Sequence, residues 1–88
     1  MEEGLLKDNT KTFLKSAQIV YDTKDFTSAT ILYFKALFSV IDLIILKNKG
    51  KIPKDHSERF RILEYSEPEL YVLLDKFYPI YRNTYTAK

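Results

Sequence analysis

Cysteine and tryptophan are absent from this sequence, and histidine occurs once, as His56. Without cysteine the chain can form neither a disulfide framework nor a thiolate metal site. One histidine is too few for a zinc site, which usually takes three or four nitrogen and sulfur ligands from the protein. We therefore expect no metal ion and no other cofactor.

The net charge is also small. Fourteen Lys and Arg residues against twelve Asp and Glu residues give a formal charge of +2, too little for the non-specific phosphate attraction of a protein that coats DNA. One local basic cluster is present, formed by Lys47, Lys49, Lys51 and Lys54. Two interpretations of it are open: the cluster contacts an RNA backbone or an acidic partner, or it only keeps an exposed loop soluble.

Glycine and proline are scarce, with two and three residues, and they fall where an all-helical chain would be interrupted. No strand pattern and no internal repeat competes with this interpretation. A chain of 88 residues makes one small domain, which buries roughly 60–65% of the surface of its unfolded chain. The sequence predicts a single all-α domain over residues 1–88, an antiparallel up-and-down bundle of three long helices and one short helix.

Two long helices are expected first. From about Leu5 to Tyr21, apolar residues recur at steps of three, four and seven, which is the spacing of one helical face. After a polar break, a second helix is expected from about Phe26 to Lys49, with Asp25 or Thr27 as its N-cap. Gly50 follows it at the position where a left-handed cap residue is usual.

The second predicted helix is apolar around most of its circumference. Its most apolar segment, the sixteen residues Ile31–Leu46, also carries Lys35 and Asp42. As a helix it would reach about 24 Å against roughly 30 Å of membrane hydrocarbon, so we expect a buried helix rather than a membrane span. Three partner helices do not easily wrap it, and we infer that part of it meets a second copy across a two-fold axis. Lys35 and Asp42 either set the register of this homodimer or belong to a solvated stripe. The residues predicted for the dimer interface are Phe34, Phe38, Ile41 and Ile45.

Two further helices complete the pattern. A capping box at Asp55 predicts a short third helix from about His56 to Tyr65. A second capping box at Ser66, with Pro68 in the first turn, predicts the start of a fourth helix. The apolar positions of this helix continue with the helical period past Pro79.

The stretch LYFKALFSVIDLIILKNKGKIPKDHSERFRIL, residues 32–63, combines three features. An aromatic-rich helical segment, LYFKALF, is followed by Gly50 in a loop and by His56 and Ser57 at a turn. A late arginine, Arg82, then lies on the last predicted helix. With these features the chain resembles the HEPN superfamily of small helical bundles, over about residues 17–85.

The resemblance implies an antiparallel helical bundle that commonly dimerises. The family includes metal-independent RNA-cleaving toxins, partners of small nucleotidyltransferases in toxin–antitoxin pairs, and many members of unassigned role. Its active ribonucleases combine the arginine with a histidine after four to six intervening residues, where this sequence has Ala87 and Lys88 at the first two positions. Arg82 would then place a cation on the phosphate, while the proton acceptor near the ribose 2′-hydroxyl would be missing.

We therefore expect a non-catalytic, dimeric, HEPN-like binding module that contacts a nucleotide, an RNA segment or a partner protein near Arg82. A nucleotidyltransferase is one such partner. Two alternatives are a metal-independent ribonuclease toxin, in which Tyr85 or a group of the other subunit completes the site, and a purely structural interaction bundle. The acidic start MEEGLLKDN has neither the basic leader nor the long apolar run of a secretory signal, so we expect a cytoplasmic protein.

The candidate ligand-binding residues lie near the end of the chain: Tyr78, Arg82, Asn83 and Tyr85. Helical spacing allows the guanidinium of Arg82 to lie between the rings of Tyr78 and Tyr85 and to meet an anion there, while the rings stack on bases. The alternative is a surface arginine paired with Asp75 or a partner's carboxylate, beside tyrosines that pack in the core. In a dimer, the two Arg82 side chains are expected near a common groove. No residue is given a catalytic role, and His56 is interpreted as a residue that holds a turn.

Overall fold

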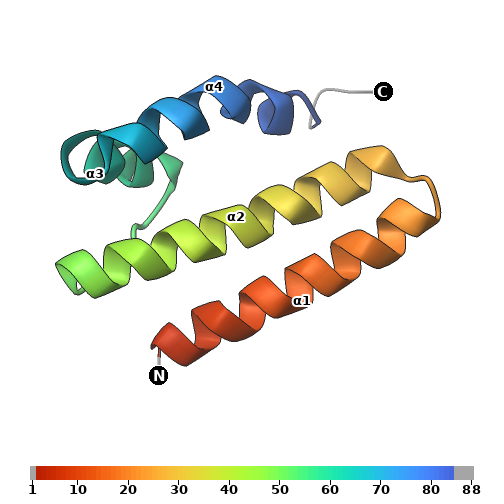
Figure 1. The fold of residues 1–88 in the computed structure, drawn as a ribbon, viewed down its shortest axis with the longest axis horizontal. Coiled ribbons are helices and arrows are strands. Elements are labelled where there is room, and N and C mark those ends of the chain that lie inside the picture. The colour runs from red at the N-terminus through yellow and green to blue at the C-terminus, as the bar shows by residue number, and fades with distance from the viewer. Residues whose placement is uncertain (1, 85–88) are drawn as a thin grey trace.

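Four helices make up most of residues 2–84, the part of the chain that this computed structural model describes: α1 (Glu2–Asp22), α2 (Phe26–Lys49), α3 (His56–Ser66) and α4 (Pro68–Thr84). No strand occurs among these residues, so the predicted all-α class is confirmed. α1 and α2 run antiparallel as a long hairpin (Figure 1). α4 lies on the other side of α2, with α3 beside its first turns, so α2 is the central helix.

Local hydrogen bonds explain why α2 begins and ends where the sequence predicts. The carboxylate of Asp25 accepts a hydrogen bond from the amide of Ser28 at 3.2 Å, which satisfies one of the open amides of the first turn. At the other end Gly50 has φ 75°, a left-handed conformation that suits glycine, and its amide donates to the carbonyl of Leu46 at 2.8 Å.

The break between α3 and α4 differs from the prediction. The carboxylate of Asp55 caps α3 as expected, by accepting from the amide of Glu58 at 2.9 Å. Ser66, however, is the last residue of α3 and does not cap α4. The two helices are separated by Glu67 alone, with φ −141° and ψ 68°. The physical reason is Pro68, whose ring disfavours the helical conformation in the residue before it.

α1 and α2 pack closely because small side chains line their contact. Ala17 of α1 and Ala29 and Ala36 of α2 are all at most 2% exposed. Alanine allows two helix axes to approach without leaving a cavity between them. In this hairpin α1 covers one side of α2.

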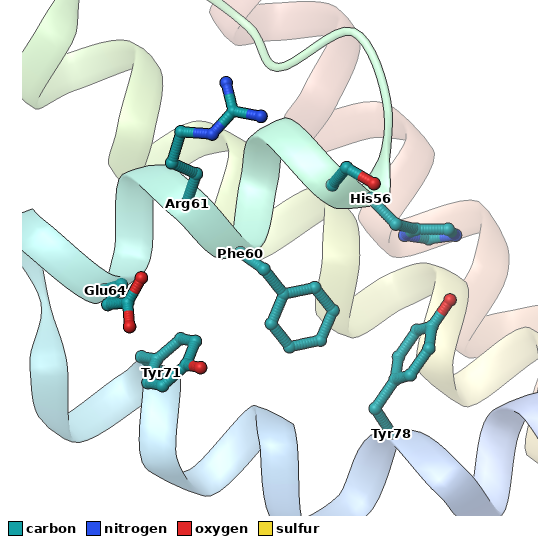
Figure 2. A pocket seen from close by; sticks show the side chains of 7 residues that line it. His56, Phe60, Arg61, Glu64, Tyr71 and Tyr78 are labelled. Carbon is teal, nitrogen blue, oxygen red and sulfur yellow. The ribbon is translucent and has the colours of Figure 1, made fainter.

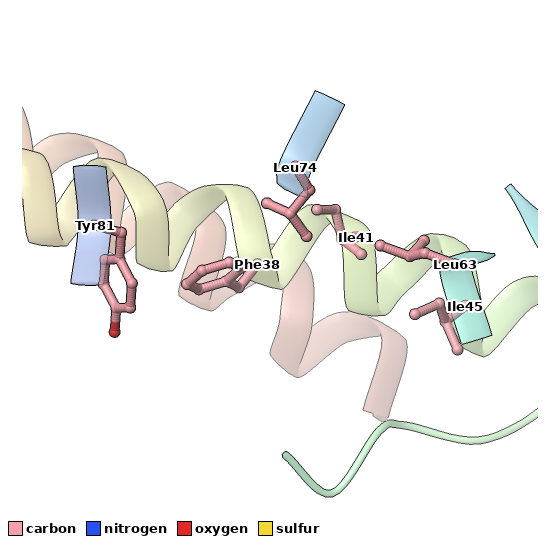
Figure 3. Close-up of a cluster of buried hydrophobic side chains, with 6 residues drawn as sticks. All are labelled: Phe38, Ile41, Ile45, Leu63, Leu74 and Tyr81. Atoms are coloured by element: carbon pink, nitrogen blue, oxygen red, sulfur yellow. The ribbon is translucent and has the colours of Figure 1, made fainter. Parts of the chain in front are cut away.

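The hydrophobic core lies on the other side of α2, against α3 and α4 (Figure 3). Three of the four residues predicted for the dimer interface belong to this core. Phe38, Ile41 and Ile45 are at most 6% exposed within the single chain, so little of their surface remains for a second copy. Phe34 is half-buried and packs its ring 5.3 Å from that of Tyr81. The buried members of the core are Phe38, Ile41, Ile45, Leu63, Leu74 and Tyr81.

Among the described residues, α2 is also the one helix that is long and apolar enough to cross a membrane. Core helices of soluble proteins meet the same criteria of length and composition. In this fold α2 lies between α1 and the α3–α4 pair, and it contributes a buried carboxylate, Asp42, to the contact with α3.

Candidate functional site

A buried ion pair joins the middle of α2 to α3. The Nε of Arg59 donates to Oδ1 of Asp42 at 2.6 Å, and a terminal guanidinium nitrogen donates to Oδ2 at 2.9 Å. Their side chains are 9% and 11% exposed. Two parallel hydrogen bonds of this kind satisfy a carboxylate and fix a guanidinium in one orientation. Asp42 is thus a buried polar group, whereas Lys35 of the same predicted stripe is exposed.

Arg59 also contacts the single histidine of the chain. Its second terminal nitrogen lies at hydrogen-bonding distance from Nδ1 of His56, in the first turn of α3. The imidazole is half-buried and packs against aromatic rings, at 4.8 Å from Phe38 and 5.5 Å from Tyr78. Burial, and secondly the positive charge of Arg59, lower the pKa of His56 from its usual value.

The contact with Arg59 determines which nitrogen of His56 carries the proton. A guanidinium is always protonated and only donates hydrogen bonds. Nδ1 must therefore be the acceptor, and the neutral ring holds its proton on Nε2. His56 can donate a hydrogen bond to a ligand, but it has no free ring nitrogen with which to take a proton.

An open cavity of about 430 Å³ lies between α3 and α4. Figure 2 shows the ring of Phe60 between those of Tyr71 and Tyr78. Phe60 meets both tyrosines edge to face, with ring centroids 6.2 Å and 5.0 Å apart. His56 lies beside the hydroxyl of Tyr78, and Glu64 lies at the opposite end beside Tyr71. The lining residues are His56, Ser57, Phe60, Arg61, Glu64, Tyr71 and Tyr78.

Of the ligand-binding residues predicted from the sequence, Tyr78 lines this cavity. Arg82 is exposed on α4, one turn after Tyr78. Spacings of seven and four residues place Tyr71, Tyr78 and Arg82 along one face of α4. Asn83 is exposed near the end of α4, where it borders a smaller hollow between α2 and α4. Tyr85 lies outside the described residues.

The predicted basic cluster is spread along the end of α2 and the loop that follows. Lys47 makes an exposed ion pair with Glu3 of α1, with 3.4 Å between Nζ and the carboxylate oxygen. Lys49, Lys51 and Lys54 are exposed. None of the four lines the cavity between α3 and α4.

The sequence interpretation missed Arg59, Phe60 and Tyr71 as parts of the site. Asp42 could have indicated the presence of Arg59, because a carboxylate in the middle of an apolar helix needs a cationic partner when it is buried. Arg59 is separated from Asp42 by seventeen positions, and helical periodicity relates only residues within a few turns. Among residues 2–84, no three His, Cys, Asp or Glu side chains are grouped so that they could hold a metal ion.

No protein-family model matches this sequence, and neither the curated proteins nor the solved structures contain a significant match to it.

Proposed function

We propose that this protein is a non-catalytic, HEPN-like binding module that holds a nucleotide unit, free or within single-stranded RNA, in the cavity between α3 and α4. One observation carries the proposal. Tyr78, which the sequence suggests as a base-stacking residue, lines an open cavity of about 430 Å³ together with two further aromatic rings. In this proposal the helices form an antiparallel up-and-down bundle of three long helices and one short helix.

The size and the walls of the cavity suit a nucleobase. Ligand sites in proteins commonly enclose about 300–1,000 Å³ and are lined by aromatic side chains with a few polar groups. Phe60, Tyr71 and Tyr78 supply rings on which a base can stack. At the end beside Tyr71, the carboxylate of Glu64 can accept a hydrogen bond from an exocyclic amino group.

The opposite end of the cavity carries hydrogen-bond donors. His56 offers its Nε2 proton, and Ser57 and Tyr78 offer hydroxyl groups. Arg82 lies one turn beyond Tyr78, about 6 Å further along the axis of α4. A ligand whose base stacks on Tyr78 would therefore direct its phosphate towards Arg82, which supplies a permanent positive charge.

The state of His56 supports the proposal of binding without turnover. Metal-free RNA cleavage needs a group that takes the proton of the ribose 2′-hydroxyl. Nδ1 of His56 is occupied by Arg59 and Nε2 is protonated, so the one imidazole in the cavity cannot act as this base. We therefore propose binding rather than cleavage. We also propose that the protein acts in the cytoplasm. The nucleotidyltransferase partner that the family resemblance implies stays a prediction.

Tyrosine fluorescence tests the binding proposal directly, because the chain has seven tyrosines and no tryptophan. Titration with 5′-AMP, 5′-GMP and a short single-stranded RNA should quench this emission to saturation. Loss of one stacked ring costs about 1–3 kcal/mol, so Phe60→Ala should weaken binding roughly 5- to 150-fold. Arg82→Ala should weaken it by at least about fivefold through the lost phosphate contact.

Tyr65→Ala is the matched control. Tyr65 is 84% exposed and lies outside the cavity, so its removal takes away one fluorophore and no binding contact. Equal affinities for the Tyr65 and Phe60 variants, or no saturable quenching by any of the three ligands, would reject the cavity as a nucleotide site.

A further inference from the structure

A broad apolar surface covers the side of α4 that faces away from the ligand cavity. Between α2 and α4 runs a groove lined only by apolar side chains, among them Leu37, Leu73 and Phe77. Ile80 and Phe26 line a second hollow between the same two helices. Along α2, Tyr33 and Val40 flank Leu37 at helical spacings of four and three residues.

The same surface continues onto α1. The hydroxyl of Tyr33 donates to the side-chain oxygen of Gln18 at 3.4 Å. Leu14 and Tyr21 flank Gln18 at spacings of four and three residues, and the ring of Tyr21 lies 5.3 Å from that of Phe26. The apolar face therefore comprises Leu14, Tyr21, Phe26, Tyr33, Leu37, Val40, Leu73, Phe77 and Ile80.

Each of these nine side chains is between 37% and 54% exposed. At roughly 200 Å² for a large side chain, they leave about 800 Å² of largely apolar surface open to solvent. This exceeds the roughly 300–600 Å² of the largest apolar patch on a typical monomer and equals the area that each partner buries in a standard interface.

We propose that the occupant of this face is a second copy of the chain, related by a two-fold axis. The exposed area of one copy is what a stable dimer needs. The face also contains a ridge and a groove. The ridge follows Tyr33, Leu37 and Val40 along α2, and it adjoins the groove between α2 and α4. A two-fold axis would insert the ridge of each copy into the groove of the other.

Charge permits the same arrangement. No ionisable side chain lines the groove between α2 and α4, and the net charge of +2 sets up little repulsion between two copies. Lys76 lies beside these residues on α4, with its ammonium 5.7 Å from the ring of Phe77, and its long side chain allows the charge to stay in water at an interface.

This interface has a consequence for the ligand sites. Arg82 follows Leu73 by nine residues, which is about half a turn around the axis of α4. A dimer formed through Leu73 therefore places the two Arg82 side chains on its outer surfaces, and each ligand cavity is complete within one chain. The common groove expected from the sequence does not form in this arrangement.

Sedimentation velocity of the full chain tests the interface. We expect a dimer at about 10 µM and at least a tenfold increase of its dissociation constant for Leu73→Glu, because each dimer then buries two carboxylates. The matched control is Val72→Glu, the neighbouring residue, which is 64% exposed and outside the groove. Circular dichroism establishes that both variants keep the helical content of the wild type.

A second measurement does not depend on a disruptive substitution. The chain has no cysteine, so Leu37→Cys and Val72→Cys each carry one thiol. Maleimide should label the thiol at position 37 more slowly at a concentration where sedimentation shows a dimer than after dilution to the monomer. The labelling rate at position 72 should be the same in both states.

Three outcomes would overturn the proposal. The first is a wild-type chain that stays monomeric at about 100 µM. A monomer that floats with phosphatidylcholine vesicles would overturn the proposal too, because a lipid surface would then be the occupant of the face. The second is equal dissociation constants for the Leu73 and Val72 glutamate variants, and the third is a position-37 thiol that is labelled equally fast in dimer and monomer.

Discussion

The guanidinium of Arg59 holds the carboxylate of Asp42 with two hydrogen bonds, 2.6 Å and 2.9 Å long, between α3 and α2. Both side chains are almost completely buried. The pair makes the polar interruption of α2 compatible with burial, and it orients the guanidinium so that its remaining nitrogen meets His56. The state of the histidine in the cavity therefore depends on a carboxylate in a different helix.

Removal of one partner of this pair should be strongly destabilising. Asp42→Ala leaves the charge of Arg59 buried and unpaired, which costs about 3–5 kcal/mol. Urea unfolding measures the loss, with an osmolyte added if the variant is largely unfolded in buffer. Lys35→Ala, an exposed position in the same helix, should change the free energy of unfolding by less than about 0.5 kcal/mol.

Replacement of both partners separates the cost of an unpaired charge from the value of the pair. The double variant Asp42→Leu with Arg59→Met removes both charges and keeps apolar volume in their place. It should be more stable than Asp42→Ala, since buried ion pairs are often neutral or unfavourable relative to well-packed apolar residues. A double variant as unstable as the single one would show that the hydrogen bonds themselves are required.

His56 should make stability depend on pH in mildly acidic solution. Burial and the charge of Arg59 lower the pKa of His56 in the folded state below its unfolded value of about 6.5. The unfolded chain then binds more protons as the pH falls through that value, so the histidine's contribution is complete above about pH 6.5 and declines below it.

Urea unfolding between pH 7.5 and pH 5 checks this dependence. The wild type should lose stability over this range more steeply than His56→Gln, which has no titrating ring. The range ends above the usual pKa values of carboxylates, about 4, so that their protonation does not dominate the result. Parallel pH profiles for the two proteins would contradict the lowered pKa.

The two glycines should respond to alanine with opposite signs. A Cβ atom would meet no neighbour within 4 Å at either Gly4 or Gly50, so only backbone conformation distinguishes them. Gly50→Ala forces a left-handed φ of 75° on alanine and should cost about 1 kcal/mol. Gly4→Ala lies in the first turns of α1 and should stabilise the protein by roughly 0.5 kcal/mol. Thermal unfolding of the two single variants measures both changes.

RNA should be bound without being cut. Labelled single-stranded RNA incubated with purified protein in excess chelator should remain intact, because the one histidine of the cavity is not available as a base. Arg82→Ala run in parallel separates this protein from a contaminating nuclease. Cleavage that disappears in the Arg82 variant would favour the ribonuclease alternative over a binding module.

The boundaries of α2 could be predicted because they depend on local interactions. The bounds of α2 follow from a side-chain cap at Asp25 and a left-handed glycine at position 50, each within one turn of the bonds it forms. The break at Glu67 was missed by one residue because the restriction that Pro68 places on its predecessor prevails over the capping preference of Ser66.

The candidate site could be predicted only in part. Tyr78 and Arg82 share a helical face, and that much follows from their spacing. The cavity needs Phe60 and Tyr71, which come together only when α3 folds back against α4. The same folding decides that Phe38, Ile41 and Ile45 lie in the core of one chain, whereas Leu37 remains at the surface.

The sequence by itself determined the helical class and the bounds of α2, because helical period and end caps act between residues a few positions apart. Only the tertiary structure decided which side of α2 is covered and that Asp42 pairs with Arg59. A helix that is apolar nearly all round gives no preferred direction for burial, so the return of α3 and α4 across it makes the choice.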